Sequence, residues 1–200
     1  VHYPWEGHEE INPGEIPTHF NPTASYVKYF TVPEQMQGKR LFISFQGAES
    51  GLALWLNGKF VGYSEDSFTP SEFELTEYVK EGENKLAAQV FKWTASSWCE
   101  DQDFYRFSGI YRDVYLYTVP EVHVNDLRIR AIPDVSLASA DFELTTKTWG
   151  KGQLKIVLSK EGNVVLEDVK EISDEDTFSW KVDAPVLWSA EDPQLYDLEL

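Results

Sequence analysis

Apolar residues recur at every second position along much of this chain, and the spacing typical of helices is nearly absent. Residues 41–46 place Leu, Ile and Phe on one face and more polar neighbours on the other, as a half-buried strand does. Two apolar runs, 52–56 and 59–63, flank Asn57-Gly58. Asn-Gly between such runs predicts a hairpin, because a type I′ turn needs positive φ at both positions. Further strands are predicted at 26–32, 85–93 and 112–117.

Helix is predicted at one place in the first 120 residues. Residues 70–80 can form one short helical turn, with Ser71 as its cap. After Pro120 the spacing remains that of strands, which are predicted at 122–132, 140–149, 153–159, 164–169, 177–182 and 196–200. Glycine-containing turns at 150–152 and 161–163 separate several of them. Short strands at intervals of roughly 8–12 residues are typical of β-sandwiches. We therefore predict an all-β chain with two sandwich domains, residues 1–120 and 121–200.

Composition narrows the range of partners. The chain has 34 Asp and Glu against 17 Lys and Arg, so its formal charge is −17. Such a field repels phosphate, which argues against nucleic acid and anionic membranes as partners. Apolar runs are only a few residues long, so no membrane-spanning segment is expected. The aromatic share of 14% is high, and aromatic residues are enriched in strands and also line sugar-binding surfaces.

Cysteine content and the first residues bear on the compartment. Cys99 is the single cysteine, which excludes a disulfide within the chain and a cysteine-rich zinc site. One free thiol fits a reducing compartment, so we expect a cytoplasmic protein, with the periplasm or secretion as the alternatives. Residues 1–4 do not read as a signal peptide, and we expect the chain to start partway through a longer protein.

The densest group of polar residues lies at 98–106, where Glu100, Asp101 and Asp103 are interleaved with aromatic residues. If this segment is extended, Asp101 and Asp103 share one face. Their oxygens could then converge on Na⁺ or Ca²⁺, or accept hydrogen bonds from sugar hydroxyls. The plain alternative is an acidic, solvated loop with Arg106 as its charge partner. The residue pattern leaves these interpretations open.

Asn21 precedes Pro22 at the start of a predicted strand, where asparagine usually initiates a turn. The four histidines are scattered without metal-ligand spacing. The sequence also contains no Gly-x-Ser-x-Gly elbow, phosphate loop or dinucleotide fingerprint. Taken alone, these patterns predict a β-protein that could face a sugar.

Several longer strings resemble family 2 glycoside hydrolases. Three of them are similar to the sugar-binding domain of that family: Leu54–Ser64, Pro70–Leu75 and Gly82–Ala87. Two more resemble its large bacterial β-galactosidase branch: Glu100–Asp103 and Arg106–Val114. Two near the end resemble the first immunoglobulin-like domain of the family: Pro185–Ser189 and Pro193–Tyr196. The resemblance runs in register along essentially the whole chain.

The resemblance implies a galactose-binding-like jelly-roll sandwich followed by an immunoglobulin-like sandwich. It also implies truncation at both ends, because the family has opening strands before the motif matched by Tyr3-Pro4 and further strands after Leu200. In this family a later (β/α)₈ barrel carries both catalytic glutamates of a retaining mechanism. No catalytic residue is therefore expected in this chain, and alone it should not hydrolyse a glycoside.

The resemblance also assigns roles to particular residues. Asp103 matches the family aspartate that binds a sodium ion and contacts the galactosyl ring, and Asn21 matches the asparagine of the same pocket. Trp98, Glu100 and Asp101 are supporting candidates that orient Asp103 or line its loop. The expected partners are a β-galactoside and the barrel of the same chain, with Mg²⁺ bound outside this fragment and the parent a homo-oligomer. Two other functions stay open: a free-standing carbohydrate-binding module and a structural pair of sandwiches.

Overall fold

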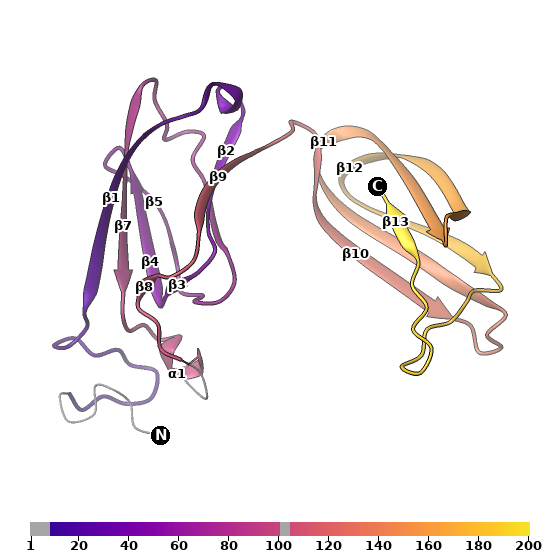
Figure 1. Ribbon diagram of the computed structural model, residues 1–200, viewed down its shortest axis with the longest axis horizontal. Helices are drawn as coiled ribbons and strands as arrows, with labels where there is room; N and C mark the ends of the chain where they lie inside the picture. Colours follow the sequence, from indigo (N-terminus) through magenta and orange to yellow (C-terminus); the bar gives the residue numbers. More distant parts are fainter. Residues whose placement is uncertain (1–8, 101–104) are drawn as a thin grey trace. The chain divides into compact units, whose positions relative to one another are not determined.

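The computed structural model describes residues 9–100 and 105–200. Its secondary structure is almost entirely β-strand, which confirms the all-β prediction (Figure 1). The chain divides into two compact units, residues 1–119 and 120–200. Each unit is described by itself below.

The first unit is built mainly from two antiparallel sheets, with a third, two-stranded sheet beside them. The larger sheet has the strand order β1 (Thr23–Thr31), β7 (Glu83–Phe91), β4 (Gly51–Leu56) and β5 (Lys59–Ser64). The smaller has the order β6 (Ser71–Glu74), β2 (Arg40–Phe45) and β9 (Val114–Val119). Three short elements join them: a ladder of β3 (Ala48–Glu49) with β8 (Gly109–Ile110), the 3₁₀ turn η1 (Glu34–Met36) and the helical turn α1 (Ser97–Glu100).

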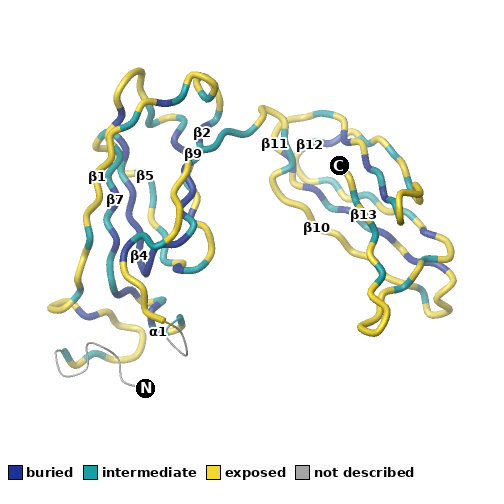
Figure 2. The backbone as a smooth tube through the Cα atoms, in the orientation of Figure 1, coloured by how far each residue is buried: buried dark blue, intermediate teal, exposed yellow. Residues whose placement is uncertain are grey.

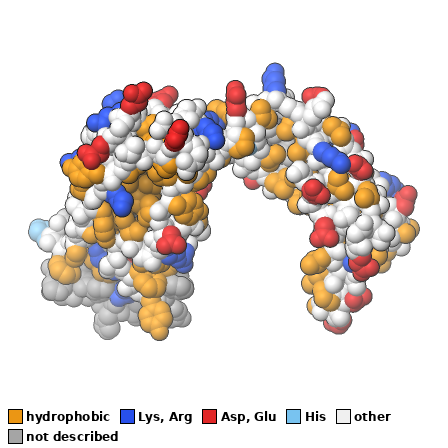
Figure 3. Space-filling view, turned by 45° about the horizontal axis from the view of Figure 1, so that its top comes forward, with side chains coloured by type: hydrophobic (Ala, Val, Ile, Leu, Met, Phe, Trp, Pro, Cys, Tyr) orange, Lys and Arg blue, Asp and Glu red, His pale blue; other side chains and the backbone are white. Residues whose placement is uncertain are grey.

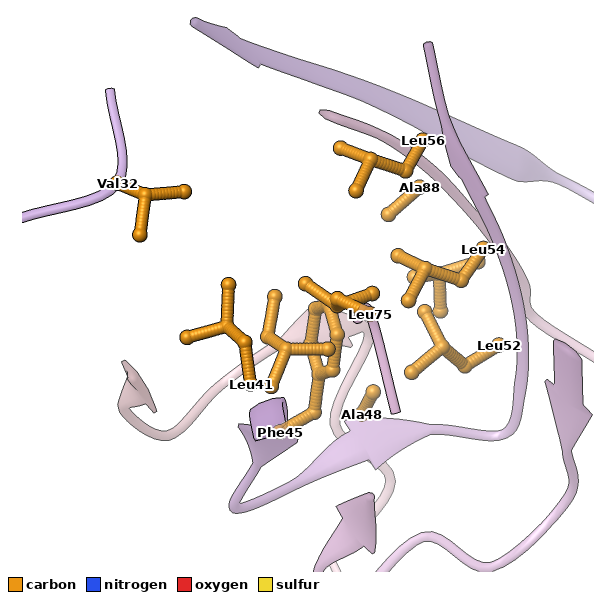
Figure 4. Packing of buried hydrophobic residues seen from close by; sticks show 11 residues of the cluster. Val32, Leu41, Phe45, Ala48, Leu52, Leu54, Leu56, Leu75 and Ala88 are labelled. Carbon is orange, nitrogen blue, oxygen red and sulfur yellow. The ribbon is translucent and has the colours of Figure 1, made fainter. Parts of the chain in front are cut away.

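The core of the first unit lies between these two sheets. Leu52, Leu54 and Leu56 point inward from β4, as the period of two residues in a strand requires. Leu41 and Phe45 of β2 face them in the same cluster (Figure 4). All five are at most 2% exposed, and burying each such side chain stabilises the fold by about 1.5–3 kcal/mol.

The predicted hairpin is confirmed. β4 and β5 pair across Asn57 and Gly58, which have φ of 53° and 82°. The Asn57 side chain also donates to the carbonyl of Tyr78 at 2.9 Å and to Oδ1 of Asn84 at 2.8 Å. Asn84 is fully buried, so this asparagine pair gives the turn polar contacts inside the unit.

The helical turn predicted from Ser71 is wrong. Residues 71–74 form β6, which pairs with β2 from Phe42↔Glu74 to Phe45↔Ser71. Phe73 and Leu75 pack against the core at strand spacing, so pairing with β2 satisfies both the backbone and the apolar side chains. The turn begins only at Leu75, whose carbonyl accepts hydrogen bonds from Tyr78 and Val79.

The second unit is dominated by one long hairpin. The unit consists of β10 (His123–Pro133), β11 (Ser139–Lys160), β12 (Asn163–Asp183) and β13 (Asp197–Glu199), and the hairpin is formed by β11 and β12. The turn predicted at 161–163 is confirmed, but the break predicted at 150–152 is wrong. There Gly150 has φ of 81° and the register shifts between Thr148 and Lys151, so the glycines form a bulge inside β11.

Two predicted strands, 164–169 and 177–182, likewise belong to the single strand β12, because β11 pairs with it almost continuously. Leu144, which precedes the bulge in β11, shares a buried cluster with Leu154 and Ile156, which follow it. Ile172 of β12 completes this cluster. The two halves of the hairpin therefore enclose one core, as in a sandwich.

Buried residues run along inner strands such as β4, whereas β1 and β10 are largely exposed (Figure 2). Acidic side chains are spread over the visible surface of both units (Figure 3). Among the residues described, no helix is long and apolar enough to cross a membrane.

Candidate functional site

Asn21 links the two strands that meet at one end of the larger sheet. Its Nδ2 donates to the carbonyl of Trp93 and its Oδ1 accepts from the Trp93 N–H, both at 2.9 Å. Lys92 N–H donates to the carbonyl of Pro22 beside it. The amide of Asn21 is thus fixed in orientation, and each of its two polar atoms has the capacity for one more hydrogen bond.

The segment before Asn21 is held by the carboxylate of Glu9. This carboxylate accepts hydrogen bonds from the backbone N–H groups of Thr18 and His19, both at 2.9 Å, and from the Thr18 hydroxyl. These donors, the two backbone groups first, lower the pKa of Glu9 to about 2. The carboxylate therefore stays charged at neutral pH and anchors the loop that leads into Asn21.

Glu100 fastens α1 to the loop that follows β5. Its carboxylate accepts from the N–H of Ser67 at 3.0 Å and from the Ser67 hydroxyl at 2.7 Å, and Ser67 is fully buried. The extended conformation considered for 98–106 does not hold at Glu100, which ends a helical turn. Thr94 and Ser97 start this turn by bonding each other, so local capping outweighs extension here.

Trp98 connects α1 to the N-terminal segment. Its indole N–H donates to the carbonyl of Glu15 at 2.6 Å. Trp93, which holds Asn21, and Glu100 both line one small hollow at this end of the unit. The three predicted site residues that the structure describes, Asn21, Trp98 and Glu100, are thus gathered around the segment from 93 to 100. Asp101 and Asp103 lie outside the described residues.

A second set of contacts holds the chain after residue 104. Lys92 Nζ forms an ion pair with Glu49 at 3.2 Å, with side chains only 15% and 10% exposed, and also donates to the carbonyl of Phe107. Phe107 stacks on Tyr111 with ring centroids 4.5 Å apart. The Tyr111 hydroxyl donates to the carbonyl of Ser67, and burial raises its pKa, so it stays protonated. Glu100 and Phe107, on either side of Asp101 and Asp103 in the sequence, are therefore both bonded to the first unit.

Arg112, two residues before β9, supports this arrangement. Its Nη1 donates to the carbonyls of Phe68 at 2.8 Å and Gln46 at 3.2 Å, so the guanidinium binds backbone rather than an open pocket. Sequence analysis missed Lys92 and Glu49, because 43 residues separate them and neither stands in a recognisable motif. The one available signal was a lysine directly after the apolar end of a strand, Val90-Phe91.

The described residues do not form a metal centre by themselves. No three His, Cys, Asp or Glu side chains within 9–100 and 105–200 gather closely enough to hold an ion. Two carboxylates at this end, Glu49 and Glu100, are engaged by Lys92 and Ser67. The sodium assignment to Asp103 stays a prediction.

The geometry defines a class of protein. Two β-sandwich units follow each other along the chain, and at one end of the first, polar contacts join Asn21 to Trp93 and Glu100 to Ser67. This is the architecture of a β-sandwich module with a polar end. Comparison with known families identifies it further. Residues 1–120 match the sugar binding domain of glycosyl hydrolases family 2, and residues 122–200 match a second domain of the same family. The chain therefore belongs to glycosyl hydrolase family 2, as its resemblance predicted.

Similar proteins are bacterial glycosidases. The chain is 52% identical over 204 residues to a β-galactosidase of Halalkalibacterium halodurans, which covers 99% of this chain and 20% of that protein. It is 48% identical over 200 residues to a β-galactosidase of Clostridium acetobutylicum, with 98% and 22% covered. A solved β-glucuronidase from an uncultured Clostridium sp. superposes with a TM-score of 0.66 at 27% identity, over 88% of this chain and 32% of that one. The chain spans about a fifth of the length of these curated relatives.

Proposed function

We propose that this chain is the non-catalytic N-terminal part of a β-galactosidase that hydrolyses terminal β-D-galactosides with retention. We further propose that it lends Asn21 and Asp103 to the galactose pocket of a barrel domain. The identity to β-galactosidases over nearly the whole chain supports the first statement. The observation that carries the second is that Asn21, Glu100 and Phe107 are all bonded to the first unit, with Asp103 between the last two in sequence.

The chemistry of the two residues suits recognition of a sugar. The Asn21 amide, held by Trp93, has one N–H and one lone pair left for hydroxyl groups. A fixed polar group of this kind discriminates between sugars, because a sugar with a misplaced hydroxyl leaves it unpaired. Asp103 adds a negative charge, which accepts hydroxyl hydrogen bonds and compensates a cation better than a neutral side chain does.

Sodium, when bound with Asp103 as one ligand, would supply a fixed positive charge that orients sugar oxygens. The chain's own part is to hold the loop, and Glu100, Lys92 and Tyr111 do this through Ser67 and Phe107. Trp98 and Asp101 are proposed as supports of the same loop. Both catalytic glutamates and any Mg²⁺ are proposed to belong to the barrel, and the parent protein to be a homo-oligomer of the cytoplasm.

The test compares this chain with its full-length parent. The parent should hydrolyse a chromogenic β-galactoside, and the 200-residue chain should show no turnover even at high protein concentration. Calorimetric titration of the chain with galactose should give no saturable heat in sodium or in potassium buffer. Turnover by the chain that a point mutation within it abolishes would contradict the proposal, and so would saturable, sodium-dependent binding of galactose.

A further inference from the structure

β1 forms one edge of the larger sheet, where it pairs with β7 over all nine of its residues (Figure 1). This pairing has no register shift, so β1 is a regular strand. Among the residues that the structure describes, no strand pairs with the other side of β1. An edge of this kind presents a row of backbone N–H and C=O groups to which another strand can bind.

One hydrogen bond beside β1 shows which of its backbone groups face away from the sheet. Lys92 N–H donates to the carbonyl of Pro22, and this pair continues the register that sets Thr23 opposite Phe91. Hydrogen-bonded residues alternate along an antiparallel strand, so the even-numbered residues of β1 bond to β7. The odd-numbered residues point their N–H and C=O groups away from β7: Thr23, Ser25, Val27, Tyr29 and Thr31.

The sequence of β1 suits pairing with a second copy of itself. In an antiparallel pair about a two-fold axis at Val27, Val27 lies opposite its copy and Thr23 lies opposite Thr31. Tyr26 then lies opposite Lys28, where an aromatic ring and an ammonium group attract each other. Lys28 is the one charged residue of β1, so no like charges lie opposite each other.

The distribution of charge also favours this edge. The chain has a formal net charge of −17, so two copies repel each other in general. Residues 16–33 contain neither Asp nor Glu, although the whole chain has 34 of them, and Lys28 gives β1 a positive charge. Close approach of two copies along β1 therefore costs little electrostatic energy.

Other outer strands carry features that hinder such pairing. β5, at the opposite edge of the larger sheet, has a bulge in its pairing with β4. β10 has a bulge in its pairing with β11 and carries Arg128 and Arg130. β9 is only six residues long and is followed directly by Pro120. Bulges, charges and short length protect sheet edges, whereas Val27 and Tyr29 of β1 are 57% and 56% exposed.

We propose that two copies of this chain pair through β1, antiparallel about a two-fold axis at Val27. The two four-stranded sheets then become one continuous sheet. For the parent protein this inference rests on the homo-oligomer proposed above, to which it gives a contact surface. The pairing itself needs neither sodium nor a ligand, and it uses no residue of the candidate site.

The first experiment measures the mass of the 200-residue chain by sedimentation equilibrium at a series of concentrations. We expect a monomer in dilute solution and a dimer at about 0.1–1 mM, because a single pair of strands gives a small interface. Val27→Lys sets two like charges opposite each other and should weaken dimerisation at least about fivefold. Val169→Lys is the matched control, since Val169 is 53% exposed on β12 and the net charge changes equally; it should dimerise as the unmodified chain does.

A second variant acts on the backbone alone. Val27→Pro removes an N–H that points away from β7, so it should leave the first unit folded and abolish the dimer. Thermal unfolding of each variant shows whether it is folded. A variant that is unfolded is set aside, and disulfide cross-linking then decides.

Cross-linking tests the register directly. In the proposed dimer the Cα atoms of the two Val27 residues lie about 5.5 Å apart, which a disulfide can span. Val27→Cys in a Cys99→Ser background should form a covalent dimer on oxidation, and Val169→Cys in the same background should not.

Three results would overturn the proposal. The first is a chain that remains monomeric up to about 1 mM. The second is a dimer that Val27→Lys and Val169→Lys affect equally, and the third is a dimer that Val27→Cys does not link. Galactoside hydrolysis by the parent enters none of these measurements, so this proposal and the proposed function can fail separately.

Discussion

The loop end of the first unit and the Asp134 turn of the second unit use polar side chains in different ways. In the first unit, polar contacts at the loop end join residues far apart in sequence: Asn21 binds Trp93, and Ser67 donates to Glu100 and accepts from Tyr111. In the second unit, the Asp134 carboxylate binds Ser136, Ala138 and Ser139 within its own turn. Local bonds of the second kind stabilise a turn. Bonds across 33 to 72 residues hold separate segments in one fixed arrangement, as a binding site requires.

The largest effect should come from the core of the first unit. Leu54→Ala removes a side chain that is 0% exposed between the two sheets and leaves a cavity. We expect the free energy of unfolding of the first unit to fall by about 2–5 kcal/mol. Chemical denaturation followed by tryptophan fluorescence measures this. Leu137→Ala, at an exposed turn of the second unit, is the control and should have little effect; equal effects would contradict the described core.

Asn21→Ala should have the next largest effect on the free energy of unfolding. It tests whether a long-range polar contact stabilises the first unit. The substitution leaves the N–H and carbonyl of Trp93 without their side-chain partners, which costs about 1–3 kcal/mol. In the parent protein it should also raise KM for a galactoside. Thr23→Ala removes one weaker bond beside it, to the carbonyl of Asn21 at 3.2 Å, and serves as the control. If both variants behave alike in denaturation and in kinetics, the bond from Asn21 to Trp93 contributes to neither stability nor activity, which would contradict the account.

A smaller effect is expected on the pH dependence of the thermal stability of the second unit. Hydrogen bonds from Ser139 and Ser136 lower the pKa of Asp134 to about 2, from an ordinary value of 3.8. As the pH falls, Asp134 is therefore protonated in the unfolded chain before it is protonated in the folded chain. The stabilisation that the Asp134 carboxylate gives the folded state is complete above about pH 4 and is lost as the pH falls toward 2. Asp134→Asn should make the melting temperature less dependent on pH between 5 and 2.5. Scanning calorimetry measures the melting temperature, with Asp141→Asn as the control. Equal pH dependence of the melting temperature in Asp134→Asn and the unmodified chain would refute the stabilising role of Asp134.

Local patterns predicted the parts of the fold that local physics decides. Asn57-Gly58 specifies its hairpin because positive φ at both positions is a property of those two residues. The prediction at Ser71 failed because pairing with β2, some thirty residues away, outweighs a capping residue. Gly150 reads as a turn in sequence, yet β12 pairs on both sides of it and makes it a bulge.

The candidate site, like the fold, was predictable from the sequence only in part. The family resemblance pointed to Asn21, Trp98 and Glu100, and the structure gathers them at one end of the first unit. Residue patterns could not show that the Asn21 amide is held by Trp93, since 72 residues lie between them.

The most direct test of the central claim is the kinetics of Asp103→Ala in the full-length parent, measured in sodium and in potassium buffer. If Asp103 serves the galactose pocket, this variant should lose at least about tenfold in kcat/KM for a chromogenic galactoside, or about 1.4 kcal/mol, and the difference between the two buffers should shrink. Asp141→Ala, an exposed aspartate of the second unit, should leave both unchanged. An Asp103→Ala enzyme with unaltered activity and sodium response would contradict the account and leave the chain as a structural pair of sandwiches.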